Sequence, residues 1–206
     1  MSAPAKVGLY FGSFNPVHMG HLVIANHMAH YTDLDAVWFV VTPQSPQKAK
    51  NALIAFEHRL QMVRLALADN PVLSATDVEA HLPEPHYTAA TLRRLRADFP
   101  EVAFSVIIGE DNFDALHTWK DFEELLNHHR VLVYPRRSPD APVPLETQCN
   151  QAATQHLHAN VEHCDAPMIS ISSTYLRQAI LANKDIRYLL PDKVLNYIGN
   201  NHLYEG

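Results

Sequence analysis

Hydrophobic and polar residues occur along this chain with two different periodicities. Short and nearly continuous apolar runs, which are typical of strands covered on both faces of a parallel sheet, occur at 7–11, 36–41, 102–108 and 130–134. Apolar residues recur at helical spacing in the segments 22–29, 56–68, 89–97, 122–126, 172–182 and 192–197. Strands that alternate with helices indicate an open α/β fold with right-handed crossovers.

Two stretches fall outside this pattern. Residues 135–144 contain four prolines, which can continue neither a helix nor a central strand, so we expect an exposed loop there. We expect residues 199–206 to form a terminal tail. A chain of 206 residues is within the usual range for one domain, and we predict a single domain over 1–206 with a small helical C-terminal extension at about 173–200.

Composition removes several classes of protein. Hydrophobic residues make up 47% of the chain, but no apolar run reaches the roughly 20 residues that a membrane span requires. The net charge of -6 gives no general attraction to nucleic acid, so any bound anion must be held by a local site. The N-terminus lacks the pattern of a secretory signal, which favours the cytoplasm, and Cys149 and Cys164 lack metal or redox spacing, which predicts free thiols.

The few glycines are concentrated near the N-terminus. Only six are present, yet Gly8, Gly12 and Gly20 lie close together, and a chain so poor in glycine uses it where no side chain will fit. The segment Gly12-Ser13-Phe14-Asn15-Pro16-Val17-His18-Met19-Gly20-His21 joins the first strand to a helix. A helix that begins near His18 or Met19 would direct its unpaired N–H groups into the crevice at the carboxyl end of the sheet, where a phosphate is favoured.

His18 and His21 are the first candidate binding residues. On the first turn of a helix both rings could donate hydrogen bonds to one phosphate chain, and Gly20 would remove a side chain where the ligand approaches. The structural alternative is a helix start with two incidental histidines, in a chain that has 14. A zinc site would need at least a third ligand, which the sequence does not supply.

A second candidate is the segment Ser172-Ser173-Thr174, which precedes a predicted helix that carries Arg177. Hydroxyl groups, helix N–H groups and a planar guanidinium together suit phosphate oxygens. A helix N-cap followed by a surface arginine explains the same residues. The local sequence leaves both explanations open.

These two segments resemble the two phosphate-binding motifs of the HxGH nucleotidyltransferase superfamily. Many bacterial relatives have Gly-Gly-Thr-Phe-Asp-Pro in the first motif, whereas Asn15 here keeps the hydrogen bonds but lacks the charge. The resemblance implies a Rossmann-like, doubly wound parallel sheet, with His18, His21 and Arg177 as catalytic residues. It also implies that ATP is bound by Gly12, Ser13, Phe14, His18, Gly20, His21, Ser172, Ser173, Thr174 and Arg177.

Segments in the middle of the chain resemble the nicotinate mononucleotide adenylyltransferase branch. Gly109 and Asp111, after the third predicted strand, would contact ATP, and the substrate would be bound by Asn15, Lys48, Tyr87, Thr88 and Trp119. Each has a structural alternative: a strand-ending turn for Gly109 and Asp111, a solvated lysine, a threonine N-cap and a core tryptophan. Trp38 lies within a strand run and is expected in the core.

The resemblance implies transfer of AMP from ATP to nicotinate mononucleotide, which gives deamido-NAD and pyrophosphate in NAD biosynthesis. Neither cysteine accompanies a motif, so direct attack by the acceptor phosphate is expected, with Mg²⁺ carried by ATP and no dedicated metal cage. Other nucleotidyltransferases, acting on nicotinamide mononucleotide or phosphopantetheine, are the nearest alternative, and a noncatalytic nucleotide sensor is another. No nucleic-acid or membrane partner is expected, and homo-oligomerisation is left open.

Overall fold

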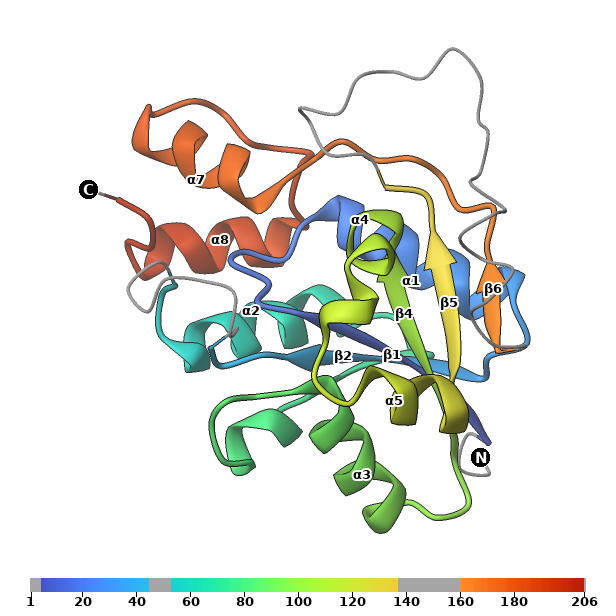
Figure 1. Ribbon diagram of the computed structural model, residues 1–206. Coiled ribbons are helices and arrows are strands. Elements are labelled where there is room, and N and C mark those ends of the chain that lie inside the picture. The colour runs from blue at the N-terminus through green and yellow to red at the C-terminus, as the bar shows by residue number, and fades with distance from the viewer. Residues whose placement is uncertain (1–4, 45–52, 137–159, 206) are drawn as a thin grey trace.

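Six parallel strands form the centre of the described structure, and helices cover both faces of the sheet (Figure 1). The computed structural model describes residues 5–44, 53–136 and 160–205. In spatial order β3-β2-β1-β4-β5-β6, the sheet consists of the strands β1 (Lys6–Gly12), β2 (Ala36–Val41), β3 (Leu73–Thr76), β4 (Ala103–Gly109), β5 (Arg130–Tyr134) and β6 (Val161–His163). This is the order of a doubly wound, Rossmann-like sheet, as predicted.

Helices connect these strands and extend the chain beyond them. In the described part of the chain, none of them has the length and apolar character needed to cross a bilayer. The α-helices are α1 (Met19–Tyr31), α2 (Phe56–Leu67), α3 (Thr88–Asp98), α4 (Glu110–Asp114), α5 (Phe122–His128), α7 (Ser173–Leu181) and α8 (Asp192–Asn200). Two short 3₁₀ turns, η1 (Val78–His81) and η2 (Leu116–Thr118), lie between them.

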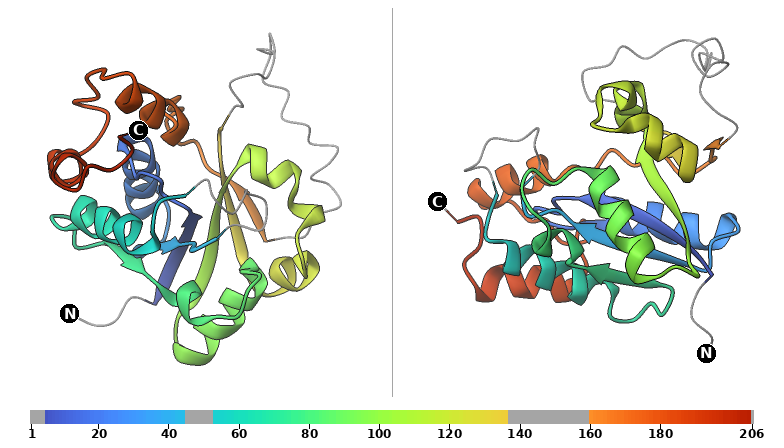
Figure 2. Two further views of the ribbon diagram at one scale, coloured as in Figure 1. Left: turned by 90° about the vertical axis from the view of Figure 1, so that its left-hand side faces the viewer. Right: turned by 60° about the horizontal axis from the view of Figure 1, so that its bottom comes forward.

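Each face of the sheet has its own hydrophobic cluster, because successive strand residues point to opposite faces. Val37, Phe39 and Val41 of β2 pack with α1, α2, α7 and α8, while Ala36 and Val40 of the same strand pack with α3 and α5. Figure 2 shows the two helical layers on opposite sides of the sheet. Covering on both faces explains why the strands read as continuous apolar runs.

The hydrophobic pattern predicted its elements correctly, with ends shifted by a few residues, but it missed the short ones. β3 has four residues of which only Leu73 is buried, and β6 has three of which two are exposed. Such strands carry too little hydrophobic signal to be seen in the sequence and form because a neighbouring strand offers hydrogen bonds. Trp38, expected in the core, is partly buried and packs against it beside Phe99 and Phe104.

The expectation of a C-terminal tail is wrong. Helix α8 continues to Asn200, and the side chain of Leu203 is buried in the cluster formed by α1, α2, α7 and α8. The hydroxyl of Tyr204 donates a hydrogen bond to Oδ1 of Asn15 at 2.9 Å. The end of the chain is therefore joined to the loop that follows β1.

The chain changes direction across the sheet at β1. From β1 it proceeds to β2 and β3 on one side, and then returns to place β4 on the other side of β1. The connections that leave β1 and β4 therefore diverge, which opens a crevice at the carboxyl ends of these two strands. Gly12 ends β1 and Gly109 ends β4, so both predicted glycines lie at this crevice.

Candidate active site

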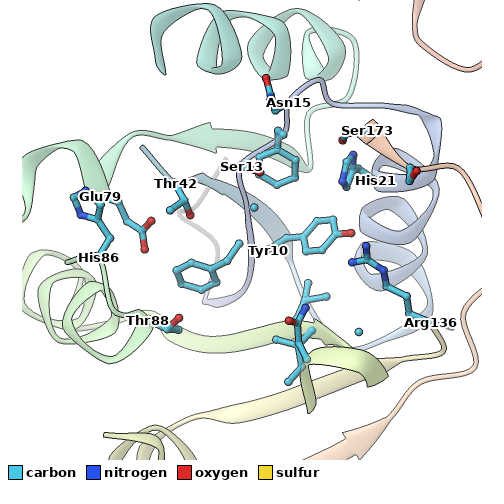
Figure 3. Close-up of a pocket in the computed structure, with 18 of the residues that line it drawn as sticks. Tyr10, Ser13, Asn15, His21, Thr42, Glu79, His86, Thr88, Arg136 and Ser173 are labelled. Atoms are coloured by element: carbon cyan, nitrogen blue, oxygen red, sulfur yellow. The ribbon is translucent and has the colours of Figure 1, made fainter. Parts of the chain in front are cut away.

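A cleft of about 550 Å³ opens at the carboxyl ends of β1 and β4 (Figure 3). The loop after β1 and the ends of β2, β4 and β5 contribute to it, together with the starts of α3 and α7. Of the predicted site residues, the cleft brings together Gly12, Ser13, Phe14, Asn15, His18, His21, Tyr87, Thr88, Gly109, Trp119, Ser172, Ser173, Thr174 and Arg177. Their individual roles remain predictions.

Among the described residues, two predicted site residues, Gly20 and Asp111, do not line the cleft. Lys48 lies outside the described residues. A Cβ atom on Gly20 would lie 3.1 Å from two ring atoms of His18 and 3.1 Å from Cγ2 of Ile169, so this glycine makes room for the His18 ring. Asp111 stands beside the cleft, and its carboxylate forms an ion pair with Nε of Arg136 at 3.5 Å.

The two histidines are in direct contact at the start of α1. His18 is the N-cap residue and its backbone N–H donates to Nδ1 of His21 at 3.2 Å. The two rings stack with centroids 3.7 Å apart. Because Nδ1 of His21 accepts a hydrogen bond, the neutral ring carries its proton on Nε2, which makes Nε2 the donor of this side chain.

His18 is held in its uncharged form. Burial lowers its pKa from 6.5 to about 4, and the positive charge of Arg136 acts in the same direction. The side chain is only 5% exposed, and Nδ1 is buried without a hydrogen-bond partner among the described residues. His18 lines the cleft, where a neutral imidazole can donate one N–H to an anion, and a bound anion would raise its pKa.

Helix α7 is bound to the loop that follows β1. Nη1 of Arg177 donates to the carbonyl oxygen of Asn15 at 2.8 Å, and the Ser173 hydroxyl donates to the carbonyl oxygen of Pro16 at 2.8 Å. Ser172 is the helix N-cap, because its hydroxyl accepts from the N–H of Tyr175 at 3.2 Å. The capping explanation therefore holds for Ser172, and the same geometry also brings the two predicted phosphate-binding segments together.

The opposite end of the cleft is formed by the start of α3 and by η2. The N-cap of α3 is Tyr87, so the threonine alternative is wrong by one position, and Thr88 is the first helical residue. Trp119 packs against the core with part of its ring while it lines the cleft, so it has both expected properties. Its Nε1 is buried without a hydrogen-bond partner among the residues described here.

Sequence reasoning missed several cleft residues. The hydroxyls of Tyr10 and Tyr134 lie 3.2 Å apart at the buried base of the cleft, beside Arg136. Glu79, 1% exposed, accepts from the Thr91 hydroxyl at 2.8 Å, and burial raises its pKa. Arg136 could have been suspected, because it follows β5 at the same sheet edge as Gly109. The tyrosines carried no such signal, since they read as strand core.

The side chains of the cleft indicate how a metal ion could be bound there. Across residues 5–44, 53–136 and 160–205, no group of three or more His, Cys, Asp or Glu side chains is arranged to hold a metal ion. The cleft instead presents imidazoles, hydroxyls and guanidinium groups, which complement phosphate oxygens. A divalent cation that arrives already bound to a nucleotide fits this donor set.

A switch-point cleft that adjoins a helix N-terminus and is lined by side chains complementary to phosphate oxygens defines a nucleotide-binding α/β protein. The sequence model of the cytidylyltransferase-like family matches residues 9–179, and the chain belongs to that family, in its nicotinate-nucleotide adenylyltransferase group. A protein of Flavobacterium johnsoniae named "Probable nicotinate-nucleotide adenylyltransferase" is 46% identical over 97% of this chain and 99% of its own length. A protein of Bacteroides fragilis with the same name is 41% identical over 95% of this chain and 92% of its own length.

Solved structures show the same fold. The nicotinic acid mononucleotide adenylyltransferase of Plasmodium falciparum, complexed with NaAD, superposes with a TM-score of 0.77. The match covers 97% of both chains at 19% sequence identity. A structure of the same protein complexed with APC gives the same TM-score. The predicted Rossmann-like fold is thus confirmed both by the sheet order and by these structures.

Proposed function

We propose that this protein transfers AMP from ATP to nicotinate mononucleotide and releases pyrophosphate, forming deamido-NAD in NAD biosynthesis. The observation that carries this proposal is the junction of the two phosphate-directed segments, where Arg177 binds the Asn15 carbonyl at one end of the cleft and Trp119 and Tyr87 line the other end. The names of the curated relatives give the same activity. One domain over 1–206, with an extension at about 173–200, is part of the proposal.

The reaction we infer is a direct displacement. An oxygen of the acceptor phosphate attacks the α-phosphorus of ATP, the bond from that phosphorus to the α–β bridging oxygen breaks, and the electron pair leaves with pyrophosphate. The protein then has to align the two substrates and stabilise charge that develops on the phosphate oxygens. Nε2 of His21, the N-terminus of α1 and Arg177 would serve this purpose from one wall of the cleft, which His21 and Arg177 line.

Mg²⁺ would be carried by the phosphate oxygens of ATP, where it neutralises charge. His18, His21, Arg177 and the hydroxyl of Thr174 would hold the remaining phosphate oxygens of that complex. Ser173, whose one hydroxyl proton is donated to the Pro16 carbonyl, would contribute its backbone N–H at the start of α7. Ser173 and Arg177 already bond to the backbone of the β1–α1 loop, so their positions do not depend on the nucleotide. A site prepared in this way limits the entropy lost when ATP binds.

The acceptor would lie at the α3 end of the cleft. Backbone N–H groups at the start of α3, near Thr88, carry the positive end of the helix dipole and favour the carboxylate of nicotinate over a neutral amide. The ring of Trp119 offers a surface for the pyridine ring. In this arrangement, a preference for the nicotinate carboxylate requires no charged side chain.

The test is pyrophosphate release from Mg-ATP with a panel of acceptors: nicotinate mononucleotide, nicotinamide mononucleotide and phosphopantetheine. We expect release that depends on the acceptor and is fastest with nicotinate mononucleotide, together with deamido-NAD identified by mass spectrometry. ATP binding without acceptor-dependent release would indicate a nucleotide sensor. Faster release with either other acceptor would replace the proposed substrate and keep the nucleotidyltransferase class.

A further inference from the structure

Arg59, on α2, is a fully buried arginine that none of the predicted motifs contains. Its side chain is 1% exposed and makes four hydrogen bonds, each to a backbone carbonyl oxygen. Nη1 donates to Ser13 at 2.8 Å and to Thr42 at 2.6 Å, Nη2 donates to Pro43 at 2.6 Å, and Nε donates to Ile54 at 3.1 Å. One side chain thus joins the loops that follow β1 and β2.

The charge of Arg59 is balanced in an unusual way. Buried cations are usually paired with carboxylates, whereas all four hydrogen-bond acceptors here are carbonyl oxygens. Burial lowers the pKa of Arg59 from its usual value, but a guanidinium remains protonated in proteins. The carbonyl dipoles point toward a full positive charge that lies directly beneath the β1–α1 loop.

The bond to Ser13 fixes the orientation of one particular peptide group. The peptide that joins Ser13 to Phe14 is trans, so its C=O and N–H point in opposite directions. Arg59 holds the C=O from the buried side, while Ser13 and Phe14 themselves line the cleft. The N–H of Phe14 is therefore directed away from Arg59.

The backbone at Phe14 also departs from the usual conformation. Its φ angle is 43°, in the left-handed region that side chains other than glycine seldom adopt. Left-handed residues in loops are typical of concave arrangements of N–H groups that bind anions. Such a conformation persists only where the surroundings enforce it, and Arg59 holds the carbonyl that immediately precedes Phe14.

We propose that Arg59 is a positioning residue for the reaction: it orients the Ser13–Phe14 peptide so that the Phe14 N–H faces the phosphates of ATP, and it places a buried positive charge behind them. This inference rests on the proposed function for the identity of the ligand. It assigns to α2, which contributes no motif residue, a direct influence on the phosphate end of the cleft.

The experiment compares Arg59→Lys and Arg59→Met with Arg64→Met as the control. Arg64 is on the same helix but exposed, where it pairs with Asp77 at 3.5 Å. Lysine keeps the charge but cannot reproduce the planar set of donors that reaches carbonyls of separate loops. We expect both Arg59 variants to raise the KM for ATP and the Kd for inorganic pyrophosphate by about 10- to 100-fold, with a smaller change in the KM for the acceptor. The control should match the wild type.

A purely structural role would lower the melting temperature and leave these constants unchanged in the folded variants at a temperature well below it. That result would overturn the inference. The pyrophosphate measurement is independent of turnover, so it decides the role of Arg59 even if the wild type shows no acceptor-dependent release, which would instead contradict the proposed function.

A second measurement keeps the inference testable if neither Arg59 variant folds. In wild-type protein labelled with ¹⁵N-phenylalanine, with the Phe14 signal assigned from a Phe14→Leu variant, inorganic pyrophosphate should shift the Phe14 amide proton downfield. The amide of Phe39, inside β2, should move far less. A Phe14 amide that does not respond while pyrophosphate binds would contradict the proposed orientation.

Discussion

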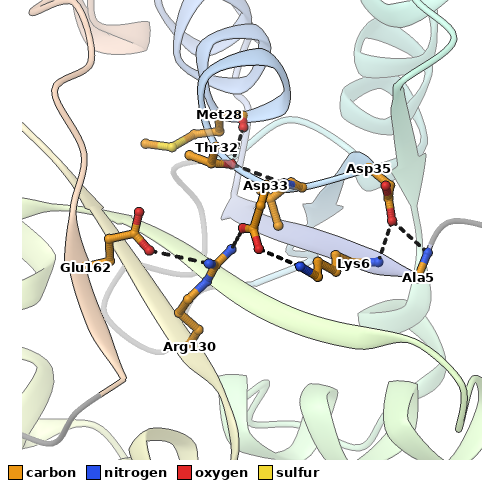
Figure 4. A network of polar contacts seen from close by, with 9 residues as sticks. Ala5, Lys6, Met28, Thr32, Asp33, Asp35, Arg130 and Glu162 are labelled. Carbon is orange, nitrogen blue, oxygen red and sulfur yellow. Dashed lines mark hydrogen bonds and ion pairs between the residues drawn. The ribbon is translucent and has the colours of Figure 1, made fainter.

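The two ends of the sheet satisfy their charges in opposite ways. At the amino end, Lys6 donates to Asp33 at 2.7 Å, and Arg130 bonds to Asp33 and, at 3.4 Å, to Glu162 (Figure 4). At the carboxyl end, Arg59 and Arg177 bond to backbone carbonyls instead, although Arg136 at the same end pairs with Asp111 at 3.5 Å. Cations whose charge is not cancelled by carboxylates attract an anionic ligand, whereas paired ones serve structure.

Polar atoms follow the same division. Along the cleft, Nδ1 of His18, Oε2 of Glu79, Nδ1 of His86 and Nε1 of Trp119 are buried without a partner among the described residues. At the amino end, the carboxylate of Asp35 accepts from two backbone N–H groups, those of Ala5 and Lys6, at 2.9 Å each. Unsatisfied buried groups cost stability, and the four found among the described residues are concentrated beside the cleft.

The largest expected effect at the carboxyl end is on turnover. His18→Ala should lower kcat by roughly 10²–10³-fold, because it removes a preorganised hydrogen-bonding group from the reacting phosphates. The control is His27→Ala on the same helix, where the His27 ring stacks on Tyr31 away from the cleft. Steady-state kinetics should show near wild-type turnover for that control. Near-normal turnover in a folded His18→Ala variant would remove this histidine from the catalytic group.

The sequence could predict some residues of the carboxyl end and not others, depending on the kind of contact that each residue makes. His18, His21 and Arg177 carried signals because they stand at fixed spacing beside a helix start. Arg59 carried no sequence signal, because its partners are backbone carbonyl groups, which every sequence contains. The contact of Tyr204 with Asn15 joins residues near opposite ends of the chain, and no local pattern reveals such a contact.

The second effect concerns stability as a function of pH. The pKa of His18 is about 4 in the folded protein and close to 6.5 when unfolded, so between these values the unfolded chain binds more protons. The free energy of unfolding should therefore rise with pH across this window, by about 1–3 kcal/mol from His18. Denaturant titrations from pH 4 to pH 7 should show a shallower rise for His18→Ala. Parallel curves would mean that His18 is not buried uncharged.

A third prediction concerns the geometry of a charged side chain at the carboxyl end of the sheet. Arg177→Lys should weaken ATP binding by about tenfold although the charge is kept, because an ammonium cannot donate in the planar, bidentate manner of a guanidinium. Arg187→Lys is the matched control, since Arg187 is exposed and pairs with Asp185 at 3.5 Å. Isothermal titration with ATP measures both. Unchanged affinity in Arg177→Lys would show that only the charge matters there.

A smaller effect is expected at the acceptor end of the cleft. Trp119→Ala should raise the KM for nicotinate and nicotinamide mononucleotides alike, by about fivefold, because stacking contributes roughly 1 kcal/mol and does not depend on the substituent. Trp119→Phe should recover part of the loss. Competition kinetics with the two acceptors gives the ratio of their specificity constants. If Trp119→Ala brought this ratio close to one, the indole ring, and not the start of α3, would distinguish nicotinate from nicotinamide mononucleotide.

The smallest effect should come from the amino end, where charges are already paired. Lys6 first, and then Arg130, hold the pKa of Asp33 at about 2, but the carboxylate is half exposed, so water and salt screen the interaction. Asp33→Asn should therefore lower the free energy of unfolding by only about 0.5–1 kcal/mol at neutral pH. Because the folded pKa lies below the unfolded one, this difference should be present above pH ~4 and disappear as the pH falls toward 2. The kinetic constants of Asp33→Asn should stay at wild-type values. A changed KM for ATP would show that the two ends of the sheet are coupled, and the division between a structural edge and a binding edge would then be too simple.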